Sequence, residues 1–462
     1  MIDIKIRENI NLRDKRVTVI GLGISGVEAA KLANYHGARV FASDLNSNEM
    51  VNAHAMDLMH TYHIASETGL QSEKVYDSDL WVLSPGVSKD NEIVLKAIEK
   101  GIPIVGEIEF ASWFTESPII AITGSNGKTT TSYILSEMCQ AENINGVMAG
   151  NMGLPFSERV LNEILNPDEN RIYILEVSSF QMEFTKHFSP AFSIYTNISP
   201  DHLDRHNSMK EYIDMKLRLA NNLKKDGSII FNDDDSILQK ALSKINKKTK
   251  AFSITRKDVL FYLDNEKIVG PSKKSLLDIN ELRIQGKHNI ANLFAAATCS
   301  HLIGITEEQI SNVMKDFKGV EHRLEHVEFI NNVEYINDSK ATNIQSVIVA
   351  IESYRKPIVL ILGGYNKGAD FRLLLPHIKS SHVRDIISYG DAGGQINTEL
   401  GDAVRSVQVT NLSSAVKKAH SLAAPGDIVL LSPGCASYDE FENFEVRGVF
   451  FKSIVKELIK PC

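Results

Sequence analysis

The hydrophobic and polar positions of this chain repeat one pattern: a short apolar run, a glycine turn and then a stretch of helical length. Two copies are clear, at residues 17–34 and 119–141. In a looser third copy, strands and helices alternate, with apolar runs at 358–362, 385–389 and 428–431 and a helical stretch at 413–423. Strands that alternate with helices predict parallel sheets covered on both faces, with ligands beyond the carboxyl ends of the strands.

The chain length and the three copies together predict three α/β domains, because 462 residues suit about three domains of ordinary size. We expect a Rossmann-like domain at 1–106, a central domain with a P-loop ATPase-type parallel sheet at 107–319, and a C-terminal Rossmann-like domain at 320–462. Residues 106–118 are expected to form a linker. The lysine-rich, weakly periodic stretch at 244–275 allows no assignment.

The first glycine turn has the spacing of a dinucleotide-binding loop. Gly21, Gly23 and Gly26 follow an apolar strand and open a helix, and Asp44 ends the next strand. Glycines allow the backbone to approach a diphosphate at a helix N-terminus, and the acid can accept a hydrogen bond from a sugar hydroxyl. The pattern does not distinguish NAD from another nucleotide diphosphate, and a turn that only packs a helix on a sheet is the alternative. Ser84-Pro85-Gly86, after the strand at 80–83, belongs either to the same edge or to an ordinary turn.

The second glycine turn resembles a P-loop. It reads Thr123-Gly124-Ser125-Asn126-Gly127-Lys128-Thr129-Thr130 between a strand and a helix. In such a loop, backbone N–H groups surround the phosphates of ATP, the lysine reaches the β- and γ-phosphates, and the following threonine contacts Mg²⁺. Ile122 occupies the place of the first glycine in the strict motif, so this is a variant loop.

Candidate metal ligands follow the strands next to this loop. Glu176 ends the strand at 171–176, where Mg²⁺ would need a hard oxygen ligand, although a solvated carboxylate is the simpler interpretation. His202 follows the strand at 191–196 with acids on both sides; it is a metal ligand, a substrate contact, or merely exposed. Lys216 lies in a predicted helix, where periodicity gives no reason to prefer it to Lys210.

Composition excludes several classes of function. The net charge of −8 argues against nonspecific binding to nucleic acids or membrane surfaces. The four cysteines are far apart and form no C-x-x-C, which argues against a zinc site and a disulfide framework. The charged N-terminus has no apolar signal core, and the longest apolar runs are only of strand length. We therefore expect a cytoplasmic protein that acts on small molecules and requires no oligomer, so that a monomer suffices.

The chain resembles the Mur ligases over almost its whole length, and within that family the branch that adds D-glutamate. The blocks that carry the resemblance are, in order, Thr123–Thr129, Gly150–Pro155, Leu175–Gln181, Asp201–Arg205, Gly286–Asn292, His322–Arg323, Asn337–Asn343, Gly363–Gly368 and Ser432–Asp439. The resemblance implies an ATP-dependent ligase with two Mg²⁺ sites, which joins D-glutamate to UDP-N-acetylmuramoyl-L-alanine in peptidoglycan synthesis.

The resemblance also implies roles for individual residues. It places the uridine diphosphate sugar, rather than NAD, on Gly23, Ile24, Ser25, Asp44, Ser84, Pro85 and Gly86, with Asn151 and Gln181 positioning the substrate. It places ATP on Gly124, Ser125, Asn126, Gly127, Lys128, Thr129 and Thr130, with further contacts from Asn292, Arg323 and Asp338. The implied metal ligands are Thr129, Glu176, His202 and Lys216, the last after carbamylation of its amine. Lys128, His202 and Lys216 are the implied catalytic residues.

The last domain points to D-glutamate as the added amino acid. Family members that add a diamino acid usually carry Asp-x-Pro-Arg there, and this sequence has none. By similarity, Lys340, Thr342, Lys367, Ser437 and Phe444 surround D-glutamate, and two lysines with hydroxyl donors suit two carboxylates. Core packing is the alternative role for Phe444. The rival functions are a Mur-type or folylpolyglutamate-type ligase with another amino acid, a dehydrogenase that uses only the first loop, and a non-catalytic nucleotide-binding protein.

Overall fold

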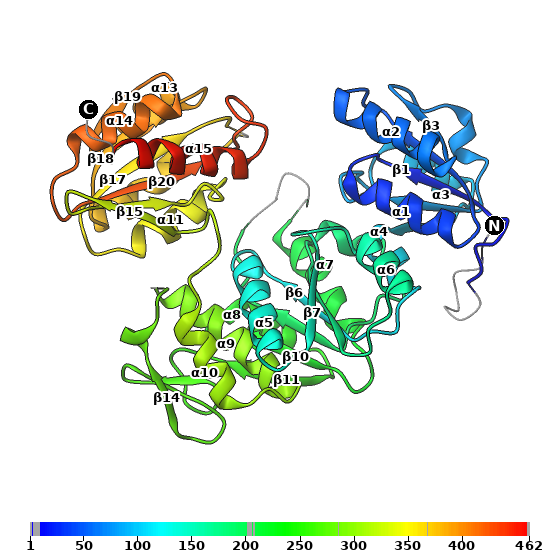
Figure 1. The fold of residues 1–462 in the computed structure, drawn as a ribbon, viewed down its shortest axis with the longest axis horizontal. Coiled ribbons are helices and arrows are strands. Elements are labelled where there is room, and N and C mark those ends of the chain that lie inside the picture. The colour runs from blue at the N-terminus through cyan, green and yellow to red at the C-terminus, as the bar shows by residue number, and fades with distance from the viewer. Residues whose placement is uncertain are drawn as a thin grey trace. The chain divides into compact units, whose positions relative to one another are not determined.

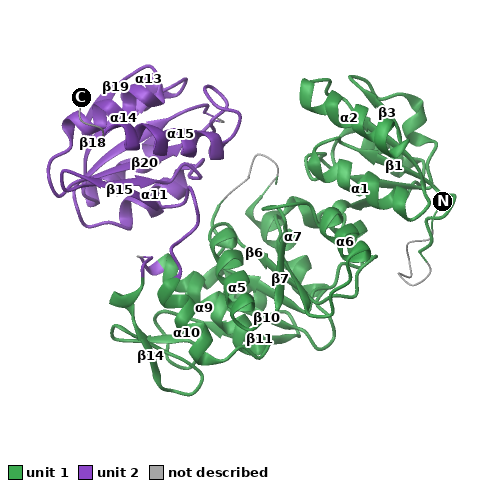
Figure 2. Cartoon of the chain, viewed as in Figure 1, with its two compact units in different colours: residues 1–282, 288–316 green, residues 283–287, 317–462 purple. Residues whose placement is uncertain are grey.

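A computed structural model describes residue 2 and residues 10–200, 206, 208–284, 286–366 and 368–459. The chain forms two compact units, Met1–Leu282 with His288–Asp316 and Arg283–Lys287 with Phe317–Cys462 (Figure 2). Parallel sheets covered by helices make up both units (Figure 1). Among the described residues, no helix is both long enough and apolar enough to cross a bilayer.

The first unit begins with a five-stranded parallel sheet. Its elements are β1 (Arg16–Ile20), α1 (Ile24–Tyr35), β2 (Arg39–Asp44), α2 (Glu49–Tyr62), β3 (Ala65–Thr68), η2 (Glu73–Tyr76), β4 (Leu80–Leu83), α3 (Glu92–Glu99) and β5 (Ile104–Gly106). The strands lie in the order β3-β2-β1-β4-β5 and pair in parallel throughout. Since the order reverses between β1 and β4, the glycine turn after β1 and the Ser84 turn after β4 lie where such sheets bind ligands.

A six-stranded parallel sheet forms the centre of the first unit. Its elements are α4 (Glu107–Ser112), β6 (Ile119–Thr123), α5 (Lys128–Ala141), β7 (Asn145–Gly150), α6 (Phe156–Leu165), β8 (Arg171–Glu176), η3 (Phe180–Met182), β9 (Phe192–Tyr195), α7 (Met209–Asn221), β10 (Ser228–Asn232), α8 (Ser236–Leu242) and β11 (Lys248–Phe252). The strand order is β11-β10-β9-β6-β8-β7. Because β6 lies between β9 and β8, the loops that follow these three strands meet at one edge.

The remaining elements of this part of the chain are short strands and two helices: β12 (Tyr262–Asp264), β13 (Lys267–Val269), β14 (Ser275–Asp278), η4 (Ile279–Glu281), α9 (Lys287–Leu302) and α10 (Glu307–Asp316). The three strands form a small antiparallel sheet, within and just after the stretch that the sequence left unassigned. The expected linker at 106–118 contains the helix α4, whose six residues are all buried. The carboxylate of Glu109 accepts hydrogen bonds there from the backbone N–H groups of Lys186, His187 and Phe188.

The second unit is a six-stranded sheet with one antiparallel edge. Its elements are β15 (Glu325–Ile330), β16 (Val333–Asn337), α11 (Ile344–Glu352), β17 (Ile358–Gly363), η5 (Phe371–Leu374), α12 (Leu375–Ser380), β18 (Val383–Tyr389), α13 (Gly393–Leu400), β19 (Arg405–Gln408), α14 (Leu412–Leu422), β20 (Ile428–Gly434) and α15 (Phe444–Glu457). The order is β15-β16-β20-β17-β18-β19, and only β15 pairs antiparallel. The parallel α/β fold expected from the sequence is confirmed.

Candidate active site

The loop between β6 and α5 is shaped by two glycines with positive φ, Gly124 at +149° and Gly127 at +85°. A Cβ on Gly124 would lie 2.0 Å from Oγ1 of Thr196, and one on Gly127 would lie 2.3 Å from Oδ1 of Asn292. No other residue fits at either position. This close approach places Asn292 of α9 against the loop. The loop leads directly into the N-terminus of α5, and helix N-termini attract anions.

The end of β9 holds the loop in place. The backbone N–H of Asn126 donates to Oδ1 of Asn197 at 2.9 Å, and the N–H of Ser125 donates to the Asn197 carbonyl at 3.0 Å. The Lys128 ammonium donates to the carbonyls of Gly124 and Ser125, at 2.9 and 3.0 Å. The lysine therefore lies back over its own loop, where a bound phosphate would meet it.

Glu176 at the end of β8 brings two expected site residues together. Its Oε2 accepts a hydrogen bond from the Thr129 hydroxyl at 2.7 Å, and its Oε1 accepts one from Nδ2 of Asn151 at 2.8 Å. The Glu176 side chain is buried. A hydroxyl, a carboxylate and an amide thus converge beside the phosphate loop, at the shared edge of β6, β7 and β8.

Lys216 of α7 lies at the same edge. Its residue is only 2% exposed, and its Nζ donates to the Gly124 carbonyl at 3.0 Å and to Oγ1 of Thr123 at 3.3 Å. The Lys210 side chain, in contrast, is 87% exposed and pairs with Asp214. The expectation that periodicity cannot separate these two lysines is wrong, because α7 buries Tyr212, Met215, Lys216 and Leu219 on one face at helical spacing.

The first glycine turn is closed by Asp44. Oδ2 of Asp44 accepts a hydrogen bond from the backbone N–H of Leu22 at 2.7 Å, and Oδ1 accepts one from Asn46 at 2.8 Å. The carboxylate thus points back toward the loop that contains Gly23. Ile24 at the start of α1 is exposed, and Ser25 is partly exposed.

A small pocket in the first unit is lined by residues from both its five-stranded and its six-stranded part. Its lining comprises Leu83, Ser84, Pro85, Val87, Gly106, Glu107, Ile108, Phe180, Gln181 and Phe184. Ser84, Pro85 and Gln181, three of the residues expected at the sugar nucleotide, therefore lie together, whereas Gly86 is outside the lining. Oε1 of Gln181 accepts a hydrogen bond from the backbone N–H of Ser178 at 2.9 Å. Glu107, which also lines the pocket, is buried, and this burial raises its pKa to about 7.

In the second unit, Asp338 follows β16 and is buried. Its Oδ2 accepts from the Ser432 hydroxyl at 2.9 Å and its Oδ1 from the Leu324 N–H at 3.2 Å. Burial raises the pKa of Asp338 to about 7, against the opposing effect of the Arg323 charge. A carboxyl group with this pKa carries less negative charge near pH 7 than an ordinary aspartate does.

Lys340 and Phe444 lie together in the same unit. The Lys340 ammonium is 5.4 Å from the centroid of the Phe444 ring, close enough for a cation–π contact. The Ser339 hydroxyl donates to the Phe444 carbonyl at 2.8 Å. Ser437 is buried and Thr342 is exposed. His202 and Lys367, both expected in the site, are outside the described residues.

Models of known protein families match this chain in three consecutive segments. A family model described as "Mur ligase MurD-like, N-terminal domain" matches residues 15–106, "Mur ligase middle domain" matches 122–300, and "Mur ligase, glutamate ligase domain" matches 322–435. A curated protein of Christiangramia forsetii, UDP-N-acetylmuramoylalanine–D-glutamate ligase, is 40% identical over 451 residues, which cover 96% of this chain and 100% of the relative. The chain belongs to the Mur ligase family.

Further relatives agree with this assignment. A protein of the same name from Thermoanaerobacter pseudethanolicus is 39% identical over 97% of this Mur ligase and 100% of its own length. The crystal structure of UDP-N-acetylmuramate-alanine ligase from Thermotoga maritima superposes with a TM-score of 0.60 at 17% identity, covering 96% of this chain and 100% of the other. This likeness confirms the three-domain α/β fold of the family.

Mur ligases are ATP-dependent and generally need Mg²⁺. The residues at the β6 edge fit such an ion, because the Thr129 hydroxyl and the Glu176 carboxylate are hard oxygen donors that already lie within 2.7 Å of each other. At Gly124 and Gly127 the side chains of Thr196 and Asn292 occupy the space that a Cβ would need.

Two residues near the site of this Mur ligase were missed from the sequence. His206 is buried, its Nε2 lies 2.8 Å from the Ser179 hydroxyl, and its ring stacks on Phe180 with centroids 5.2 Å apart. Arg447 is fully buried and donates to Ser339 and to the carbonyls of Cys435 and Ala436. A histidine among acids and an arginine in an amphipathic helix give no sequence signal of burial.

Proposed function

We propose that this Mur ligase joins D-glutamate to UDP-N-acetylmuramoyl-L-alanine with ATP, in the synthesis of peptidoglycan precursors. The substrates are those in the names of relatives that match almost the whole chain. The observation that carries the chemistry is the convergence of Lys128, Thr129, Glu176 and Lys216 on the loop after β6. A phosphate-binding loop, a lysine ammonium for the transferred phosphoryl group and oxygen ligands for a metal ion are the groups that phosphoryl transfer to a carboxylate requires.

The reaction has two steps. A carboxylate oxygen of the L-alanine residue attacks the γ-phosphorus of ATP in line, which forms an acyl phosphate and releases ADP. The amine of D-glutamate then attacks the acyl carbon, and the tetrahedral intermediate expels inorganic phosphate and loses a proton to leave the amide. The Lys128 ammonium neutralises charge on the transferred group, and Mg²⁺, when bound, supplies further cationic charge to the phosphate oxygens. His202 is our candidate for the base that takes the amine proton.

We place two Mg²⁺ ions on Thr129, Glu176, His202 and Lys216. For Lys216, carbamylation would replace the ammonium by an anionic oxygen donor. The position of this lysine supports the proposal, because a buried amine 3.0 Å from the Gly124 carbonyl stands where a metal ligand of the phosphate loop would be needed. An unmodified ammonium there would repel the ion.

In this proposal the chain has domains at 1–106, 107–319 and 320–462, and each of their large parallel or mixed sheets carries a different ligand. The uridine diphosphate sugar lies on the loops after β1, β2 and β4, with Asn151 and Gln181 at its reactive end. ATP takes the β6 loop, Asn292, Arg323 and Asp338. Lys340, Thr342, Lys367, Ser437 and Phe444 hold D-glutamate, and the cation–π pair of Lys340 and Phe444 supports that assignment.

The protein in this proposal works in the cytoplasm as a monomer and binds neither nucleic acid nor membrane. The net charge of −8 supports the expected lack of nucleic-acid and membrane-surface binding. Another Mur-type or folylpolyglutamate-type ligase is the nearest alternative, since it would share the β6 loop and differ in the amino acid.

Phosphate release decides between these alternatives. Purified protein is given ATP, Mg²⁺ and UDP-N-acetylmuramoyl-L-alanine together with D-glutamate, L-glutamate, L-alanine or a diamino acid. Among these amino acids, we expect turnover only with D-glutamate. We expect no turnover when the sugar nucleotide is replaced by a folate. Turnover with L-alanine or a diamino acid, but not with D-glutamate, contradicts the proposal.

A further inference from the structure

His322, which lies shortly before β15 in the second unit, has a strained and crowded position. Its φ is +63°, in the left-handed region that L-residues other than glycine seldom adopt. The ring is buried, and a Cβ on Gly448 of α15 would lie 2.3 Å from its Nδ1. A backbone conformation of this kind persists only where its surroundings impose it.

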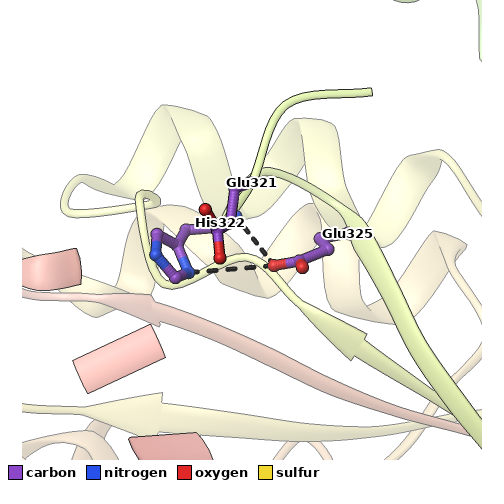
Figure 3. Close-up of side chains that lie close together, drawn as sticks. All are labelled: Glu321, His322 and Glu325. Carbon is purple, nitrogen blue, oxygen red and sulfur yellow. Dashed lines mark hydrogen bonds and ion pairs between the residues drawn. The ribbon is translucent and has the colours of Figure 1, made fainter. Parts of the chain in front are cut away.

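Glu325, the first residue of β15, supplies much of that constraint (Figure 3). Its Oε2 accepts the backbone N–H of His322 at 2.9 Å and Nδ2 of Asn337 at 2.9 Å. Its Oε1 accepts the Lys452 ammonium of α15 at 3.0 Å. One carboxylate thus ties together the turn, the end of β16 and α15.

The same cluster has the composition of a metal site, but both of its carboxylates already share a lysine. Glu321, His322 and Glu325 offer donor atoms within 4.8 Å of one another. Lys452, however, pairs with both carboxylates and neutralises part of their negative charge. Burial lowers the pKa of His322, and its neutral Nδ1 accepts from Asn337 at 2.9 Å. The cluster is a hydrogen-bonded network that fixes the turn.

The turn contacts both groups of ligand residues proposed for this unit. Arg323, expected at ATP, is the next residue after His322. The Leu324 N–H donates to Asp338, and the His322 carbonyl accepts the backbone N–H of Lys340 at 3.1 Å. A displacement of the turn therefore displaces Arg323, on the nucleotide side, and Lys340, on the amino-acid side.

We infer that Glu325 is a positioning residue for the ligase reaction, whose carboxylate fixes the 322–325 turn and thereby sets Arg323 for ATP and Lys340 for D-glutamate. The inference rests on the proposed function for the identity of these two ligands. It does not make Glu325 a catalytic residue, since its oxygens are occupied by His322, Asn337 and Lys452.

The test compares Glu325→Ala, Glu325→Gln and Lys452→Met with the control Glu334→Gln. Glu334 lies on β16 and pairs with Lys356, so the control removes an acid from an ion pair in the same sheet. For Glu325→Ala, we expect the KM values of ATP and D-glutamate to rise about tenfold each, and the KM of the sugar nucleotide to change by less than about twofold. Glu325→Gln keeps an acceptor for the His322 N–H and should restore most of the loss, while Lys452→Met should show a smaller defect in the same direction.

Hydrogen exchange measured by mass spectrometry gives a readout that does not need turnover. In Glu325→Ala, amide exchange in peptides that span 322–325 and 338–341 should be about tenfold faster than in the parent, with other peptides unchanged. If Glu325→Ala fails to fold, Glu325→Gln and Lys452→Met carry both measurements.

Unchanged exchange in these peptides overturns the inference. Faster exchange with unchanged KM values, or an equal rise in all three KM values, also overturns it, since Glu325 would then be only structural. Failure of the proposed function looks different: the parent protein itself would lack D-glutamate turnover, whereas the exchange measurement would still report whether Glu325 fixes the turn.

Discussion

Lys128 is the side chain that the proposed phosphoryl transfer depends on most. Its ammonium lies within 3.0 Å of two carbonyls of its own loop, so little rearrangement is needed to exchange them for phosphate oxygens. A charge that is already in place costs no reorganisation at the moment of reaction. Its loss should therefore affect the chemical step and spare the sugar-nucleotide loops.

Lys128→Ala should lower ATP-dependent phosphate release by about a thousandfold or more, because the charge on the transferred phosphoryl group is no longer neutralised. Binding of UDP-N-acetylmuramoyl-L-alanine, measured by calorimetry, should stay within about twofold of the parent, since the β1 and β4 loops are untouched. Lys210→Ala is the control, because that lysine is exposed on α7. A defect confined to sugar-nucleotide binding would contradict the assignment.

At the level of residues, the sequence predicts the chemical role of a side chain better than it predicts whether that side chain is buried. The Thr129 and Glu176 pair follows from motif spacing, since both residues end or begin elements that flank β6. The importance of Lys216 could be read from the apolar positions Tyr212, Met215 and Leu219, which place it on the buried face of α7. Arg447 could not be found this way, because its partners are backbone carbonyls that only the folded chain brings together.

At the scale of elements, the meeting of the phosphate loop with α9 depends on the absence of a side chain at Gly127. Gly127→Ala would force its Cβ to 2.3 Å from Oδ1 of Asn292 and strain a φ of +85°. We expect ATP turnover to fall by about a hundredfold, with the sugar nucleotide still bound. Gly304→Ala, at φ +98° with nothing within 4 Å of the added Cβ, is the matched control for strain alone. Equal losses in the two variants would show that backbone strain, and not contact with α9, is responsible.

The junction of α4 with α6 should make stability depend on pH. Glu107 of α4 accepts the backbone N–H of Ser157 at 2.6 Å, and burial raises its pKa from 4.5 to about 7. Between these values the folded chain holds a proton that the unfolded chain has lost. The contribution of Glu107 to stability therefore falls as pH rises from 4.5 to about 7, and the ionised group is destabilising above that, by an amount on the order of 3 kcal/mol.

Glu107→Gln should therefore raise the melting temperature at pH 8 and change it little at pH 5, because glutamine keeps an acceptor for the Ser157 N–H and never ionises. Thermal unfolding followed by circular dichroism at both pH values measures this difference. Glu92→Gln, at an exposed acid in the first turn of α3, is the control and should give the same small shift at both. A shift for Glu107→Gln that is equal at pH 5 and pH 8 would contradict the pKa argument.

Strands buried on both faces were predicted to within three residues at either end, because continuous apolar runs such as Leu80–Leu83 and Ile358–Gly363 have no other stable place. The sheet β12-β13-β14 was not predictable, since its strands are only three or four residues long and carry several charges. Helix α4 was mistaken for a linker because its two buried glutamates look like solvated positions until Ser157 and the 186–188 backbone are in place.

For the whole molecule, the sequence predicted the parallel α/β architecture, but not which sheets share a core. The ligands proposed for one reaction are held by residues of both compact units, so the proposed reaction requires both units to bind at the same time. We expect the radius of gyration from X-ray scattering to fall by roughly 1 Å or more when a non-hydrolysable ATP analogue and UDP-N-acetylmuramoyl-L-alanine are added together. Identical dimensions with and without the two ligands would contradict closure.

The packing of α1, α4 and α6 against one another also has a practical consequence for dissecting the protein. Residues of both leading sheets, from Val17 to Leu242, belong to a single hydrophobic cluster, so removal of one sheet exposes part of the interior of the other. Calorimetric scans should show one endotherm for these two sheets and a separate one for the unit that begins at Phe317. A protein fragment that ends near residue 316 should be soluble. A fragment that ends at residue 106 should aggregate.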